Sequence, residues 1–230
     1  MNRPVPSRRR PAGTIAALAA LTALALGTAA CTGDDGGGGG EAPTAAPTTT
    51  APPTLADLDT ATLEVDRSPF CDDVTEEAVT AALGAAPTEA VPWDTGAPTE
   101  IAPGREDLVH EVGCRWYGAG GAAAPTSPAA SAWVFVPPAT PAAAAAYVAE
   151  TAATEGCRVL EGQPAYGAPS LAQVCGAEGV AEVSFRGLLG DAWLTCTLRV
   201  PVSATFDEAA TVQRTSDWCA AVAVAAGPQD

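Results

Sequence analysis

The segment Leu171–Arg199 reads LAQVCGAEGVAEVSFRGLLGDAWLTCTLR, and its pattern decides the fold. In the middle of the segment, Val183 and Phe185 alternate with polar residues, which is typical of a strand with one buried face and one wet face. Glycine pairs on either side of this run supply the turns. We therefore predict three strands in an antiparallel meander, at residues 171–175, 180–186 and 192–199.

Further strands and two helices are predicted earlier in the chain. Thr75 and the two glutamates after it open a short helix that ends at Gly84, because acids favour the positive end of the helix dipole. Thr140 and Pro141 begin an alanine-rich helix that runs to about Thr154. Strands are predicted at residues 109–117, 131–136 and 157–161, and the proline-rich residues 85–107 are predicted to be irregular.

The C-terminal segment carries a helix start and a stripe of apolar residues. Residues 205–208 read TFDE, which fits a capping box. The stripe that follows at helical spacing consists of Val212, Cys219, Val222 and Ala226. Helices separated by groups of antiparallel strands indicate an α+β fold, in which an antiparallel sheet has its helices packed on one face and is cross-linked by disulfides.

Six of the seven cysteines lie beyond residue 65. An even set of cysteines in an exported chain indicates disulfides. The alternative, a metal or thiol site, is disfavoured because the sequence has no CxxC motif and a single histidine. Pairing in chain order would join neighbouring elements, and it gives Cys71–Cys114, Cys157–Cys175 and Cys196–Cys219.

The N-terminus has the order of a bacterial secretion signal. Four arginines lie within the first ten residues, and residues 14–30 are uncharged, rich in alanine and leucine, and end in small residues. A transmembrane anchor is the alternative, but the apolar run is at the lower limit of a span and much of it is weakly hydrophobic alanine. We predict that residues 1–30 are a signal peptide.

Cys31 directly follows the small residues Thr-Ala-Ala, an order that resembles the bacterial lipobox, in which such a cysteine becomes the acylated N-terminus. A disulfide of Cys31 is the alternative, and the odd total of seven cysteines argues against it. A glycine run and a Pro/Thr/Ala-rich segment follow, which is typical of a flexible linker. We predict lipidation at Cys31, a disordered tether over residues 31–65, and a single globular domain over residues 66–228 on the extracytoplasmic face of the cell membrane.

The charge excludes one class of partner. The chain has 27 acids and 11 bases, and four of the bases precede Cys31, which leaves 7 bases and a net charge of -20 after the signal peptide. A surface this acidic repels phosphate backbones, so nucleic-acid binding is not expected. The partners we expect are the membrane, through the lipid, and an unidentified envelope protein or small ligand.

No catalytic constellation or metal site is recognisable in the sequence. His110, the single histidine, is expected on a strand as an exposed structural residue, because no nucleophile motif such as Gly-x-Ser-x-Gly accompanies it. The acid pairs at 34–35 and 72–73 lack the ligand spacing of a calcium loop. We therefore predict no catalytic residue, no metal and no cofactor.

Five tryptophans allow two readings. Trp116, Trp133 and Trp193 lie on predicted strands, and Trp218 adjoins Cys219 in the last helix, which favours packing in the core beside disulfides. An aromatic cleft that binds a ligand is the alternative. Trp93, within the irregular segment, is expected to be the most exposed of the five.

Two motifs resemble those of a widespread actinobacterial family of lipoproteins of unknown function. These are the run from Phe70 to Gly84, FCDDVTEEAVTAALG, and the later GCRW at residues 113–116. They match that family's cysteine, its "LTPEEVAAALG"-like helix and its Cys-x-Trp strand, and the resemblance extends loosely over residues 66–228. The resemblance implies a lipid-anchored cell-envelope domain and transfers no catalytic residue.

We therefore expect a non-enzymatic, sensor-like domain that binds a ligand or partner. The alternatives are an envelope hydrolase with scattered acidic catalytic residues, and a structural spacer. Converging carboxylates of raised pKa would favour a hydrolase. An apolar surface with one or two arginines would favour binding.

Overall fold

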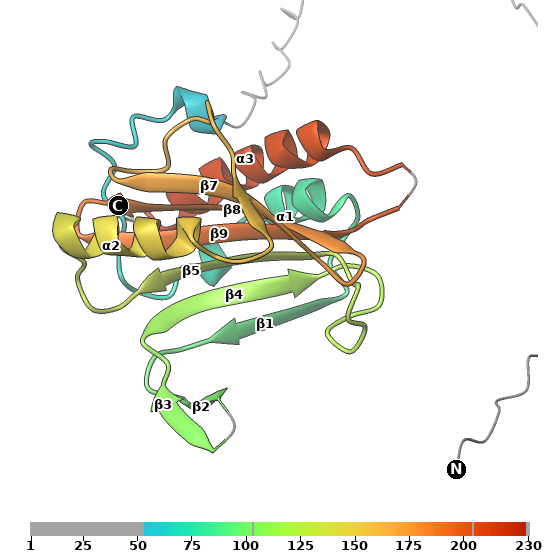
Figure 1. The fold of residues 1–230 in the computed structure, drawn as a ribbon, viewed down its shortest axis with the longest axis horizontal. Coiled ribbons are helices and arrows are strands. Elements are labelled where there is room, and N and C mark those ends of the chain that lie inside the picture. Colours follow the sequence, from blue (N-terminus) through green and yellow to red (C-terminus); the bar gives the residue numbers. More distant parts are fainter. Residues whose placement is uncertain (1–52, 103, 204, 229–230) are drawn as a thin grey trace, which may run out of the picture. The chain divides into compact units, whose positions relative to one another are not determined.

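The computed structural model describes residues 53–102, 104–203 and 205–228, whose arrangement is shown in Figure 1. Seven strands form one sheet in the order β1-β4-β5-β9-β8-β7-β6, and all neighbours are antiparallel. The strands of this sheet are β1 (Glu89–Trp93), β4 (Glu111–Tyr117), β5 (Ala129–Phe135), β6 (Cys157–Val159), β7 (Ser170–Ala177), β8 (Val180–Leu189) and β9 (Ala192–Pro201). The helices are α1 (Glu76–Leu83), α2 (Pro141–Ala152) and α3 (Glu208–Ala225). The predicted α+β fold is confirmed.

The predicted meander is observed as β7, β8 and β9, although its strands run further than the sequence pattern indicated. Gly187, which we expected in a turn, lies inside β8. A Cβ at this position would collide with the carbonyl oxygen of Tyr166. The glycine therefore permits a close approach of two backbones, while Gly190, with a φ of 61°, occupies the turn.

Residues 85–107 are not irregular, as predicted, because they contain three strands. The segment forms β1 at the edge of the sheet, and β2 (Pro98–Ala102) pairs with β3 (Arg105–Leu108) in a separate hairpin. Proline had disfavoured strands here, but an edge strand has one side without a partner, where a missing N–H costs no ladder bond. Pro92 lies in that edge strand, opposite Cys114.

Alternate residues of β9 contact helices on opposite sides of the sheet. Cys196 is bonded to Cys219 of α3, whereas the Trp193 ring packs edge-on against Tyr147 of α2, with centroids 5.4 Å apart. We call these two sides the α3 face and the α2 face. The expected packing of helices on one face describes α1 and α3; α2 lies on the other face, over a small apolar cluster of its own at one end of the sheet (Figure 1).

The main core lies between the sheet and α3. Trp218 of α3 is 2% exposed, and its ring meets Trp116 of β4 edge-on with centroids 5.4 Å apart. The predicted stripe of α3 is buried along its length. Trp116, Trp193 and Trp218 are thus core residues, as the packing interpretation predicted, whereas Trp133, which it also placed in the core, is only half-buried.

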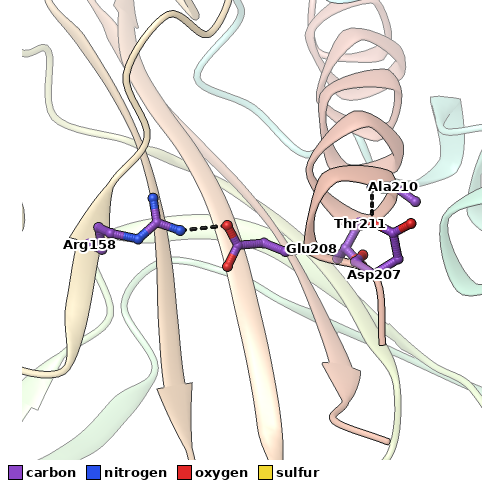
Figure 2. Close-up of polar contacts among 5 residues, drawn as sticks. All are labelled: Arg158, Asp207, Glu208, Ala210 and Thr211. Atoms are coloured by element: carbon purple, nitrogen blue, oxygen red, sulfur yellow. Dashed lines mark hydrogen bonds and ion pairs between the residues drawn. The ribbon is translucent and has the colours of Figure 1, made fainter. Parts of the chain in front are cut away.

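The helix starts are set by short polar side chains. The Thr75 hydroxyl accepts a hydrogen bond from a backbone N–H of α1, as predicted, and Gly84 ends α1 with a φ of 77°. The predicted capping box at residues 205–208 is wrong: Asp207 caps α3, and Glu208 forms an ion pair with Arg158 of β6 (Figure 2). Both side chains of that pair are about half exposed, so the pair contributes little stability.

The six cysteines beyond residue 65 lie in three bonded pairs, in the predicted chain order. The Cα atoms are 5.9 Å apart in Cys71–Cys114, 4.0 Å in Cys157–Cys175 and 5.7 Å in Cys196–Cys219. The first pair joins the 3-10 turn η2 (Cys71–Asp73) to β4, the second joins β6 to β7, and the third joins β9 to α3. Each bond therefore links two elements that are adjacent in the fold.

The folded part of the chain begins before residue 66, so the predicted boundary of the tether is too late. Leu55 lies in the 3-10 turn η1 (Leu55–Asp57) and is 1% exposed, and Val65 is also buried in the main core. The Thr60 hydroxyl donates to the Ala165 carbonyl, and the Asp66 N–H donates to the Ala226 carbonyl at 2.8 Å. None of the helices in the described part is long and apolar enough to cross a membrane.

Candidate functional site

The part of the α2 face that lies on β1, β4 and β5 carries a cluster of five residues in a cross. The register places Trp93 of β1 and Trp133 of β5 on either side of Gly113 in the central strand β4. Glu111 and Arg115 precede and follow Gly113 on the same face of β4, because alternate residues of a strand share a face. We call these five residues the tryptophan platform.

The two indole rings of the platform cover Gly113. Their centroids are 6.4 Å apart, with an angle of 48° between the ring planes. A Cβ at Gly113 would collide with the backbone of β5 and would lie 2.8 Å from Cζ2 of Trp93. The absence of a side chain at this position thus lets the rings close over the strand and fixes them against it.

The rings are partly open to solvent. Trp93 and Trp133 are both half-buried, and their neighbour Val91 is 39% exposed. Figure 1 shows α2 over the opposite end of this face, and among the described residues no helix lies over β1 and β4 on this side. The platform is therefore a rigid aromatic surface that is accessible from outside.

Opposite charges flank the rings. Burial raises the pKa of the Glu111 carboxyl above its ordinary value, while the positive charge of Arg115 and a hydrogen bond from Trp93 oppose that shift. The Arg115 Nε–H donates to the Ser131 hydroxyl at 2.8 Å. Both charged groups are thereby oriented beside the rings, and they leave the platform with no formal net charge.

A row of polar residues crosses the sheet from the platform toward α2. The cross-strand partners in this row are Arg115, Ser131, Thr197, Ser184 and Gln173. Gln173 and Ser184 are almost fully buried, and their Oε1 and Oγ atoms have no hydrogen-bond partner among the described residues. Buried polar atoms normally find a partner in protein, water or ligand, so this row has unused hydrogen-bonding capacity.

A cleft of about 700 Å³ lies elsewhere, and it is polar. It is lined by residues 64–68 and 189–191, and two of its lining residues, Arg67 and Asp191, form an ion pair of 3.3 Å. A second cleft, of about 610 Å³, opens beside the platform at the end of β1. Its lining residues are Pro69, Cys71, Asp72, Asp73, Pro92, Trp93, Asp94 and Gly113. Cys71 is bonded to Cys114 of the α3 face and Pro92 lies opposite Cys114, so most of this cleft, with its carboxylates, lies on the α3 side of the sheet at the edge of β1.

The other residues considered as candidate sites in the sequence do not form a site in the described ranges. Cys31 and the acid pair at 34–35 lie outside the described residues. His110 has a side chain that is 64% exposed, 3.8 Å from a carboxylate oxygen of Asp107. Asp72 and Asp73 lie exposed in η2, and no group of three or more metal-ligating side chains occurs in the described ranges.

Sequence reasoning missed Glu111, Gly113 and Arg115 as site residues. A signal was present in the motif GCRW, where Gly113 and Arg115 alternate with Cys114 and Trp116. Cys114 and Trp116 face the core, so the other two residues must share the opposite face. What the sequence did not reveal was that Trp93 lies beside them.

Comparison with known proteins assigns the chain to no family. No protein-family model matches the sequence, and a search of curated proteins finds no match. Function is therefore inferred from the platform and from the sequence motifs.

Proposed function

We propose that the chain is a lipid-anchored protein of the cell envelope whose folded domain binds a ligand or partner and is not an enzyme. The proposed cellular location rests on the signal-like residues 1–30 and on Cys31. Three disulfides support an oxidising compartment. The resemblance of residues 70–84 and 113–116 to motifs of actinobacterial lipoproteins supports the same cellular location.

The single observation that carries the binding role is the tryptophan platform. Two half-buried tryptophans at the uncovered end of a sheet leave apolar ring surface in water, which is unfavourable unless something covers it. The rings are held against Gly113 and are flanked by a carboxylate and a guanidinium. Rigid aromatic surface with a few oriented polar groups is typical of a binding site.

Hydrolysis is supported less well. Glycoside hydrolysis requires two carboxyl groups that face each other across the bond. On the α2 face, the strand positions around Glu111 are Gly113, Phe135 and Trp93, and none of them is a carboxylate. Burial raises the pKa of Glu111 although Arg115 on the same strand opposes the shift, but a single carboxyl group does not supply the pair that this reaction requires.

Position-specific photo-crosslinking in intact cells tests this proposal. A benzophenone amino acid at Val91, beside the platform, should form a reproducible adduct with an envelope component. Val224 on α3 is the matched control, because it is also an exposed valine (49% against 39%) and lies on a different element. Equal adduct patterns from the two positions, or no adduct at Val91, would contradict binding at this surface.

A further inference from the structure

We infer that the tryptophan platform binds an uncharged glycan, an inference that rests on the binding role proposed above. A sugar ring has an apolar face of C–H bonds and a rim of hydroxyl groups. Recognition of such a ligand therefore needs a flat aromatic surface for the face, and charged or amide side chains at the edge for the rim. The platform and its surroundings combine these two elements.

The first element is the pair of rings. Trp93 and Trp133 extend from the strands on either side of β4, and their ring centroids are 6.4 Å apart, so the two rings together form one aromatic surface larger than a single ring. The tilt of 48° between the rings allows each of them to contact a different sugar unit. Because Gly113 holds both rings in place, little side-chain entropy is lost on binding.

The second element is the set of polar groups at the edges of the rings. Arg115 and Glu111 offer donors and acceptors for hydroxyl groups on the two sides of Gly113. A ligand rich in hydroxyl groups is the class that complements both of these groups.

The charge of the surface selects against ionic ligands. On the strands of the α2 face, three arginines balance three glutamates, namely Arg115, Arg186 and Arg199 against Glu89, Glu111 and Glu182. The rest of the chain is strongly acidic, so an anion is repelled on approach. At the rings, Glu111 and Arg115 balance each other, so neither an anion nor a cation gains a net attraction there. A neutral ligand needs no such attraction.

Calorimetric titration of the full membrane-extracted chain tests the inference. The probes are neutral hexaoses of glucose, mannose, arabinose or N-acetylglucosamine, with hexagalacturonate as the anionic probe and choline as the cationic probe. We expect at least one neutral hexaose to bind, and we expect both charged probes to bind more weakly. A nucleobase stacked on one aromatic ring gains about tenfold or more in affinity. We expect a comparable gain for the face of a sugar, so Trp133→Ala and Trp93→Ala should each weaken binding about tenfold.

Two further variants separate recognition from a folding defect. Trp93→Phe keeps a ring over Gly113 and should lose less affinity than Trp93→Ala. Val224→Ala, on α3, should leave the affinity unchanged. The inference is overturned if no neutral hexaose binds at about 10 mM, if a charged probe binds more tightly than every neutral one, or if Trp93→Ala binds as well as the unmodified chain. If the Val91 adduct forms while these titrations fail, the binding role survives and the glycan is wrong.

Discussion

Replacement of Gly113 by alanine tests the platform most directly. The added Cβ would meet the Ala132 carbonyl oxygen, and it would lie 2.6 Å from Cβ of Trp133 and 2.8 Å from Cζ2 of Trp93. Carbon atoms in ordinary contact are about 3.5–4.0 Å apart, so each carbon contact is too short by about an ångström. The two atoms of β5 cannot rotate away, because one belongs to the backbone and the other is bonded directly to it.

The expected cost follows from this geometry. Forcing an extra carbon into a packed site costs about 1–3 kcal/mol, and we expect about 2–3 kcal/mol here because β5 or the Trp93 ring must shift. Gly176→Ala is the matched control. Gly176 also lies in a strand, β7, and a Cβ there would meet nothing within 4 Å. The control should change the free energy of unfolding by less than about 0.5 kcal/mol.

Urea unfolding followed by tryptophan fluorescence and circular dichroism measures both variants. A lower midpoint at an unchanged m-value would show lost stability of a fold that is otherwise intact. Gly113→Ala should also shift the tryptophan emission to longer wavelength, because the displaced ring is more exposed to water. If Gly113→Ala proves as stable as Gly176→Ala, the two rings do not close over β4 and the described packing of the platform is wrong.

Four further results are expected. Cys31→Ala should release the protein from the membrane, and intact mass of the unmodified protein should show a diacylglycerol adduct; a variant that still requires detergent would contradict lipidation. Glu111→Gln should raise the melting temperature at neutral pH and lose this advantage in acid. Burial holds the folded-state pKa of Glu111 above the ordinary 4.5, so the stability of the unmodified protein falls as the pH rises from 4.5 through that folded-state pKa. A difference in melting temperature that does not change with pH would count against burial as the cause. Replacing both Cys196 and Cys219 by serine should cost about 3 kcal/mol for a separation of 23 residues and speed amide exchange in α3, whereas unchanged protection would show that packing alone holds the helix. Leu55→Ala should lower the free energy of unfolding by about 2–5 kcal/mol, because Leu55 is 1% exposed in the core. If chemical unfolding shows no loss of stability, Leu55 belongs to the tether and not to the core.

Local patterns in the sequence determined much of the fold. The alternation in β8 and the glycines around it predicted the meander, because the period of two is a property of one strand and its turn is a property of a few residues. The start of α1 at Thr75 and its end at Gly84 were predicted for the same reason. The cysteine pairing was predicted from an even count and from the adjacency of consecutive elements.

The tertiary structure alone decided which elements meet. A strand pattern shows which residues share a face, but neither which strand lies beside them nor what covers that face, since pairing depends on residues distant in sequence. Hence the sequence revealed neither α2 on the second face nor Trp93 opposite Gly113. The pKa of Glu111 also depends on this assembly, because burial in the folded chain raises it while the hydrogen bond from Trp93, a residue of the paired strand β1, lowers it.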